Sequence, residues 1–143
     1  GEQMRELLEE SGIRTLEDET ILVDDRFYLT GRRDYSSGKS GITRKSPEQL
    51  LQDLDKTKPI IVMDHQPKQL AELADAGADL DLCGHTHDGQ LFPGNIVTAL
   101  MWENSCGYLK KGDMHNIVTS GAGIFGPYMR VGTKSEIVVI NVS

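Results

Sequence analysis

The chain has 143 residues, of which 38% are apolar and 6% aromatic, and its formal net charge is -7. This size and composition are typical of one soluble domain whose core rests on aliphatic side chains. The acidic balance disfavours a general nucleic-acid binder or docking on an anionic membrane, because both functions need clustered Lys and Arg. No apolar stretch approaches the ~20 residues of a membrane span.

The first part of the chain predicts a helix, a hairpin and a loop. Apolar residues recur at helical spacing over residues 2–10, and Gly12 is a plausible stop. The β-prone runs 20–23 and 27–30 are close enough to pair as a hairpin. Residues 31–45 are rich in Gly, Ser and basic side chains, so we expect a mobile surface loop with fast amide exchange.

The next helix has a clear start. Ser46 can cap it, Pro47 suits its first position, and Gln49 completes a capping box. The Leu residues that follow give this helix a buried face, and Lys58-Pro59 closes it.

A strand–helix–strand unit follows. Residues 60–63 and 80–83 are short apolar runs, typical of strands covered on both faces. Between them, residues 68–76 predict a helix that ends at Gly77.

The last part of the chain is β-like. Residues 107–110 and 116–120 predict a hairpin, residues 136–142 predict a final strand, and Gly94-Asn95 predicts a turn. Together these elements indicate an α/β fold with a mixed sheet (α+β in character) and helices packed on it.

Three of the four histidines are predicted to meet. His65 and His85 each follow the end of an apolar strand, and ligands of α/β units gather beyond the carboxyl ends of strands. His87 lies two residues past His85, which in extended backbone puts both side chains on one face. Neutral imidazole is the commonest protein metal ligand. We therefore expect one metal-binding edge with ring nitrogens a few Å apart.

Two motifs carry a family resemblance. Residues 64–67 read Asp-His-Gln-Pro, and residues 84–90 read Gly-His-Thr-His-Asp-Gly-Gln. This pair resembles the C-terminal motifs of the calcineurin-like metallophosphoesterases, and within them the small bacterial phosphodiesterase-like branch. The resemblance implies the C-terminal half of a four-layer αββα sandwich. On this reading residues 1–143 form a single partial domain, whose N-terminal half with the Asp and Asn ligands is missing.

The resemblance also implies a metal site and an activity. His65 and His85 would bind one divalent ion and His87 a second, with manganese, iron or zinc as the candidates. The intact parent would be a hydrolase that cleaves a phosphodiester or phosphomonoester with metal-activated hydroxide. The triplet Asp113-Met114-His115 comes too late in the chain for the family's Asp-x-His, so we interpret it as a hairpin tip. No catalytic residue is assigned, and we expect this chain to be inactive alone.

Several alternatives stay open at this point. The protein could instead be a non-catalytic metal-binding or interaction module on a phosphoesterase fold. The basic loop is either a solvated insertion or a phosphate-binding element that uses Arg32, Arg33 or Lys39. Removing half of a sandwich exposes apolar surface and a sheet edge, so we expect self-association. Because the chain opens at Gly1 without Met, its localisation is undetermined: cytoplasmic, or membrane-associated through a missing N-terminal anchor.

Overall fold

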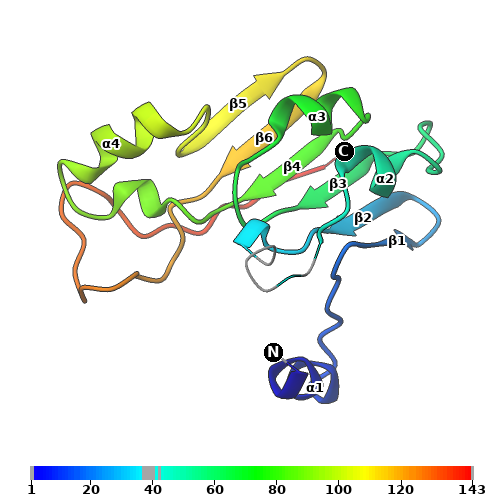
Figure 1. Ribbon diagram of the computed structural model, residues 1–143, viewed down its shortest axis with the longest axis horizontal. Helices are drawn as coiled ribbons and strands as arrows, with labels where there is room; N and C mark the ends of the chain where they lie inside the picture. Colours follow the sequence, from blue (N-terminus) through cyan, green and yellow to red (C-terminus); the bar gives the residue numbers. More distant parts are fainter. Residues whose placement is uncertain (1, 37–40, 42, 143) are drawn as a thin grey trace.

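A single mixed sheet organises the protein. The computed structural model describes residues 2–36, 41 and 43–142. Six strands lie in the order β1-β2-β3-β4-β6-β5. Their bounds are Glu19–Val23 (β1), Phe27–Gly31 (β2), Ile60–Met63 (β3), Leu80–Cys83 (β4), Gly107–Lys111 (β5) and Met114–Val118 (β6). Antiparallel hairpins at each edge flank a parallel centre, so the mixed α/β class predicted from the sequence is confirmed (Figure 1).

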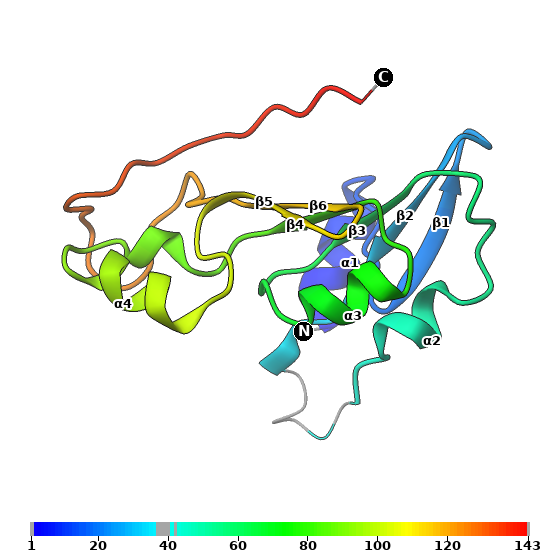
Figure 2. The same ribbon diagram turned by 90° about the horizontal axis from the view of Figure 1, so that it is seen from above.

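The helices occupy separate places around this sheet. They are α1 (Glu2–Glu10), α2 (Pro47–Leu51), α3 (Leu70–Asp75), α4 (Gly94–Met101) and a short 3-10 turn η2 (His87–Gly89). Figure 2 shows α2 and α3 together on one face of the sheet, and α4 beyond its end. Figure 1 shows α1 standing off the sheet on an extended connection.

Local signals in the sequence set the position of α2. Ser46 Oγ accepts a hydrogen bond from Gln49 N at 3.2 Å, and Ser46 N donates to Gln49 Oε1 at 2.9 Å. Pro47 occupies the first turn, where a missing N–H costs nothing. The predicted capping box is confirmed.

The core lies between the sheet and the α2–α3 layer. Alternate strand residues such as Ile60 and Val62 point into it and are completely buried. The buried apolar cluster consists of Leu50, Leu51, Ile60, Val62, Leu70, Leu73, Ala78 and Met114. On the opposite face of the sheet, Ile61, Leu82 and Ile117 stay partly exposed. One face of the sheet is therefore packed, and the other is apolar and open.

Two predicted elements are wrong. Residues 136–142 form no strand. Within the described part of the chain, they make one hydrogen bond between backbone groups, in which Glu136 N donates to Gly121 O at 3.1 Å. A strand needs a paired neighbour, and this segment runs separately over the open face of the sheet (Figure 2). Gly94-Asn95 does not form a free turn but begins α4. The β-branched residues after it conceal the helical pattern.

Other boundaries differ slightly. Helix α3 begins at Leu70 rather than Lys68, because Gln69 takes a left-handed φ of 62°. Asp113 lies in the turn between β5 and β6, as the hairpin-tip interpretation predicted. In the loop 31–45, residues 37–40 and 42 lie outside the described residues, so its expected mobility stays a prediction.

A buried carboxyl group stands in the middle of the sheet. Asp81 of β4 is completely buried, and its Oδ2 accepts hydrogen bonds from Asn116 Nδ2 at 2.9 Å and Cys83 Sγ at 3.2 Å. Among the described residues its Oδ1 has no partner. Burial, assisted by the nearby charge of Asp64, raises the pKa of Asp81 to about 6 from an ordinary 3.8.

This carboxyl group should make stability fall as pH rises. The folded pKa lies above the unfolded one, so the protonated native state is favoured most below about pH 4, and that advantage is lost as pH rises through about 6. Asp81→Asn keeps an acceptor without the charge. We expect it to exceed the wild type at neutral pH by on the order of 2–3 kcal/mol of unfolding free energy and to converge with it in acid.

Urea unfolding across this pH range measures the effect. The exposed Asp53→Asn is the control and should leave the pH dependence unchanged. A constant difference between Asp81→Asn and the wild type at every pH would show that folding does not change the pKa of this carboxyl group.

Candidate functional site

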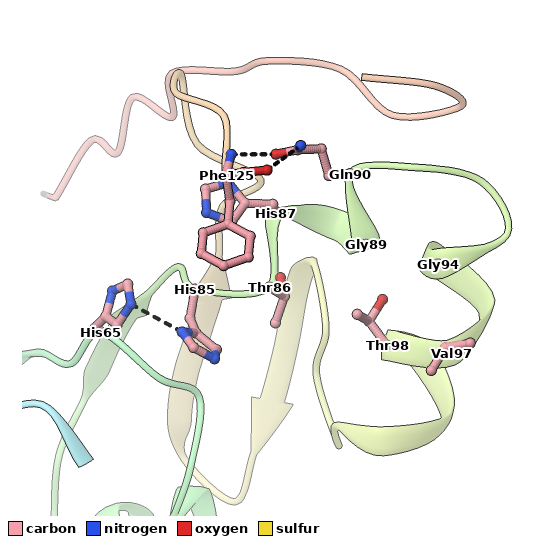
Figure 3. Close-up of a pocket in the computed structure, with 10 residues that line it drawn as sticks. All are labelled: His65, His85, Thr86, His87, Gly89, Gln90, Gly94, Val97, Thr98 and Phe125. Atoms are coloured by element: carbon pink, nitrogen blue, oxygen red, sulfur yellow. Dashed lines mark hydrogen bonds between the residues drawn. The ribbon is translucent and has the colours of Figure 1, made fainter. Parts of the chain in front are cut away.

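Two histidines meet at the carboxyl edge of the sheet. His65 lies just past β3 and His85 just past β4, and Gly84 N donates to His65 O at 3.1 Å, joining the two connections. His85 Nδ1 lies 3.1 Å from His65 Nε2, with the ring planes at 85° (Figure 3). Both side chains are accessible to solvent. The parallel strand ends thus place a pair of imidazole nitrogens side by side.

The third histidine stands apart from this pair. His87 stacks on Phe125, with ring centroids 6.2 Å apart and planes at 21°. Its Nδ1 is buried and has no hydrogen-bond partner among the described residues. Within the described part of the chain, no three His, Cys, Asp or Glu side chains are grouped so that they could hold a metal ion. The structure brings His65 and His85 together and leaves His87 separate.

All three histidines nevertheless line one cavity of about 680 Å³. In Figure 3 they form one wall of it, while Val97 and Thr98 of α4 lie across from them and Phe125 lies over His87. The cavity therefore has one wall of nitrogen donors and another of mostly apolar groups. Such a mixture is typical of sites that bind small molecules.

The turn that carries His85 and His87 is strained. Both residues, with Asp88 and Gln90, have φ between 50° and 71°, a region that non-glycine residues rarely adopt. Gly89 also has positive φ, and a Cβ there would overlap the backbone of Gly94 and Asn95 at the start of α4. Strained turns of this kind persist only where surrounding contacts hold them.

Hydrogen bonds from the loop 121–131 supply those contacts. The amide of Gln90 donates to Phe125 O at 2.6 Å and accepts from Phe125 N at 2.6 Å. Arg130 donates to His87 O at 3.2 Å and to Ser120 O at 2.7 Å. The histidine turn is thus locked to a segment some 40 positions further along the chain.

The electrostatic environment favours neutral imidazoles. Partial desolvation, followed by the neighbouring His65, lowers the pKa of His85. Desolvation and then the charge of Arg130 lower the pKa of His87. Both rings are therefore uncharged at neutral pH, which is the form that binds metal ions.

Several proteins of known family are similar in sequence to this chain. An uncharacterized metallophosphoesterase of Campylobacter jejuni is 36% identical over 116 residues, which is 79% of this chain and 30% of that protein. Another, from Aquifex aeolicus, is 29% identical over 98% of this chain and 54% of its own length. A Danio rerio transmembrane protein with metallophosphoesterase domain is 39% identical over 55% of this chain and 19% of its own length. The chain belongs to the metallophosphoesterase family. The resemblance read from the two histidine motifs is confirmed.

This metallophosphoesterase chain matches only part of each relative. It spans between 19% and 54% of the length of these three proteins. No family model matches the chain, and no solved structure matches it. Among the described residues, no helix is long and apolar enough to cross a membrane.

The arginines proposed as phosphate ligands have other partners in this metallophosphoesterase. Arg32 is buried and donates to Asp64 Oδ2 at 2.9 Å and to Gln69 Oε1 at 2.8 Å. Arg33 is half-buried and pairs with Glu17 at 3.0 Å. Neither lines the histidine cavity. Their role in substrate binding stays a prediction, and Lys39 lies outside the described residues.

The sequence reasoning missed one whole side of the cavity. Val97 and Thr98 lie on a helix within a region interpreted as β-like, and Phe125 lies in a segment to which no role was assigned. One feature of the sequence could have indicated this apolar side of the cavity: no charged residue occurs from Gly89 to Trp102, the stretch that follows the two motif histidines.

Arg32 should matter chiefly for stability. Arg32→Ala leaves Asp64 buried with only Arg44 as a cationic partner, so we expect a loss of about 2–4 kcal/mol in unfolding free energy. The matched control Arg33→Ala removes a more exposed arginine, which pairs with Glu17 and lies 3.8 Å from the buried Asp18, and should cost less than Arg32→Ala. Chemical denaturation measures both. An Arg32→Ala protein of undiminished stability that loses phosphate or vanadate affinity would instead establish the substrate-binding role.

Proposed function

We propose that the parent protein is a metal-dependent phosphoesterase that hydrolyses a phosphodiester or phosphomonoester at a two-metal site to which this chain contributes histidine ligands. The observation that carries the proposal is the His65–His85 pair, whose nitrogens lie 3.1 Å apart in an open cavity of a metallophosphoesterase. Two divalent ions, when bound, would lower the pKa of a water molecule and neutralise charge on the phosphoryl group.

The spacing of the pair suits a shared metal ligand set. Two imidazole nitrogens that are each about 2.1 Å from one ion lie roughly 3.0–3.4 Å apart in tetrahedral or octahedral geometry. The separation of 3.1 Å falls in that interval. His87 supports a second ion in a different way, because its buried Nδ1 has no hydrogen-bond partner among the described residues. A ligand set of these histidines together with Asn and carboxylate ligands from the rest of the parent protein suits manganese, iron or zinc.

The fit is incomplete in one respect. The described residues bring two donors, and no third His, Cys, Asp or Glu, to any one metal position. The proposal therefore assigns the remaining ligands to the parent protein beyond these 143 residues, since the relatives are longer than the chain. The role of this chain is to hold His65 and His85 on two strand ends and to supply the apolar wall opposite them.

The incomplete ligand set also favours a second candidate. A phosphoesterase fold that has lost its carboxylate ligands could serve as a non-catalytic metal-binding or interaction module. The parent gene distinguishes the two: Asp-x-His and Gly-Asn-His motifs upstream of Gly1 support the enzyme, and their absence supports the module.

We further propose that the parent protein associates with a membrane through a segment outside this chain. The support is the Danio rerio relative, which is 39% identical and is a transmembrane protein by name.

The chain by itself should bind metal weakly and not turn over substrate. We expect calorimetry with manganese or zinc to find one weak site at most, and no hydrolysis of bis-p-nitrophenyl phosphate. His65→Ala and His85→Ala should each weaken binding at least about tenfold, because each removes one of two neighbouring ligands. His115→Ala is the control, since His115 pairs with Tyr108 on the hairpin. Tight binding of two ions with turnover would mean that this chain completes the site by itself.

The open face of the sheet should drive self-association. Apolar surface of this kind is uncommon on monomers, so we expect light scattering to detect a dimer or larger species. Leu82→Glu places a charge in the middle of the open face and should give monomers. Leu22→Glu, at the edge strand β1, tests pairing through the edge instead. A wild-type chain that stays monomeric at high concentration contradicts both modes.

A further inference from the structure

A second cavity, of about 310 Å³, borders the histidine site. It lies between the start of α3 and the end of α4, and the residues that line it include Lys68, Leu70, Met101 and Trp102. Trp102 also contacts His85, with ring centroids 5.5 Å apart and ring planes at 66°. One aromatic ring therefore belongs to both places. We call the second space the Lys68 cavity.

The ammonium group of Lys68 lies between two aromatic rings. Its Nζ is 4.0 Å from the centroid of the Tyr35 ring and 5.4 Å from that of Trp102. Cation–π contacts at these distances are attractive, so they hold the end of a side chain that is otherwise flexible. Neither contact neutralises the charge, because an aromatic ring carries none.

The protein does not pair this cation with an anion. Within the described residues, the Lys68 ammonium forms no ion pair. Glu103 is the one carboxylate among the described residues that line the cavity, and it pairs with Lys111. Asp34, in the loop after β2, accepts a hydrogen bond from Ser36 N at 2.7 Å. The Lys68 cation is therefore left for an anion from outside the chain.

Buried arginines beside the cavity add to its positive charge. The guanidinium of Arg44 lies 5.5 Å from the centroid of the Tyr35 ring, which also contacts Lys68. Arg44 and Arg32 share the single carboxylate of Asp64, and both arginine side chains are almost completely buried. A local surplus of positive charge thus remains in a chain whose net charge is -7, and solvent reaches it at the half-buried Lys68. A local field of this sign raises the concentration of anions.

The surroundings of Lys68 favour an anionic ligand. Lysine binds phosphate and carboxylate groups as a point charge. The apolar walls formed by Leu70, Met101 and Trp102 lower the local dielectric, which strengthens such an ion pair. The same cation acts on the histidine site, because it lowers the pKa of His85 in addition to the larger effects of desolvation and of His65.

We propose that the Lys68 cavity binds an anionic group, a phosphate or a carboxylate, next to the histidine pair, with the Lys68 ammonium as its charged contact. On the proposed phosphoesterase function, on which only the source of the anion rests, this group is a second anion of the substrate. The substrate class is then a phosphoester that carries a further phosphate or carboxylate. Lys68 is a specificity-determining residue in this arrangement, since it contacts a part of the substrate that does not react.

Quenching of tryptophan emission tests the anion site without metal or turnover. Trp102 is the only tryptophan of the chain, and its ring contacts Lys68. In EDTA, anionic iodide should quench Trp102 more strongly than cationic caesium does, although the chain as a whole is acidic. At constant ionic strength, inorganic phosphate should protect Trp102 from iodide but not from neutral acrylamide.

Matched variants make the test specific to Lys68. Lys68→Met keeps an apolar stem without the charge and should lower the iodide-to-caesium quenching ratio at least about twofold. Lys68→Arg keeps the charge and should behave as the wild type does. Lys58→Met is the control, because Lys58 pairs with Asp25 and precedes β3, at the opposite end of that strand from His65. Circular dichroism checks that all three variants fold.

Phosphonocarboxylates identify the source of the anion. With manganese bound, at least one member of a series of increasing chain length should bind about tenfold more tightly than methylphosphonate, and Lys68→Met should abolish this gain. Equal affinity throughout the series would assign a free anion to the cavity and overturn the substrate class.

The contrary outcomes are distinct. The anion site is overturned if iodide has no advantage in the wild type, if phosphate gives no protection, or if Lys68→Met and Lys58→Met lose the preference equally. Absence of metal binding or hydrolysis contradicts the proposed function, and with it the substrate class, but leaves the quenching results unaffected. The anion site and the proposed function therefore fail separately.

Discussion

The position of His65 depends on a buried carboxylate one residue before it. Asp64 accepts hydrogen bonds from Arg32 at 2.9 Å and from Arg44 at 2.8 Å, and both guanidiniums also reach Gln69 Oε1. These partners come from the end of β2, the loop after it and the start of α3. A buried charge is costly unless it is fully paired, so all three segments must converge where β3 ends.

This convergence fixes the geometry of the histidine pair. Asp64 N donates to Leu82 O at 3.0 Å, and Gly84 N donates to His65 O at 3.1 Å, which extends the β3–β4 ladder past the strands. The connections after the two strands are thereby held side by side, and His65 and His85 face each other. The ion network determines where the first imidazole stands, and the extended ladder determines where the second stands.

Most of the regular elements could be predicted because their signals are local. The capping box at Ser46 and the apolar run of β3 each lie within a few residues. The predictions that failed concern features that depend on residues far apart in the sequence. Residues 136–142 have the pattern of a strand, but pairing depends on a partner that local sequence does not reveal. Arg32 reads as part of a solvated loop, and only the fold shows that Asp64 draws it into the interior.

The arrangement of the histidines also shows which features local sequence can predict and which it cannot. The strand-end argument for His65 and His85 agrees with their 3.1 Å separation, because it rests on topology. The argument for His87 assumed extended backbone, in which side chains two residues apart share a face. His85 and His87 instead both have positive φ, so that alternation does not apply. The three histidines could be recognised from their two motifs, but the left-handed turn that sets His87 apart could not.

That turn also connects the chemistry of the cavity to the surface beside it. Gly89 packs against the first residues of α4, and Gln90 is hydrogen-bonded to Phe125, so the turn that carries His85 and His87 is joined directly to the apolar wall. A ligand whose charged group meets His65 and His85 would place its remaining atoms against Val97 and Phe125. On the proposed phosphoesterase function, a phosphoester with an apolar substituent would suit both walls, whereas a small hydrophilic one would suit only the first. The histidine turn thus sets the polarity of the whole cavity, because it brings a nitrogen wall and an uncharged helix to opposite sides of the same space.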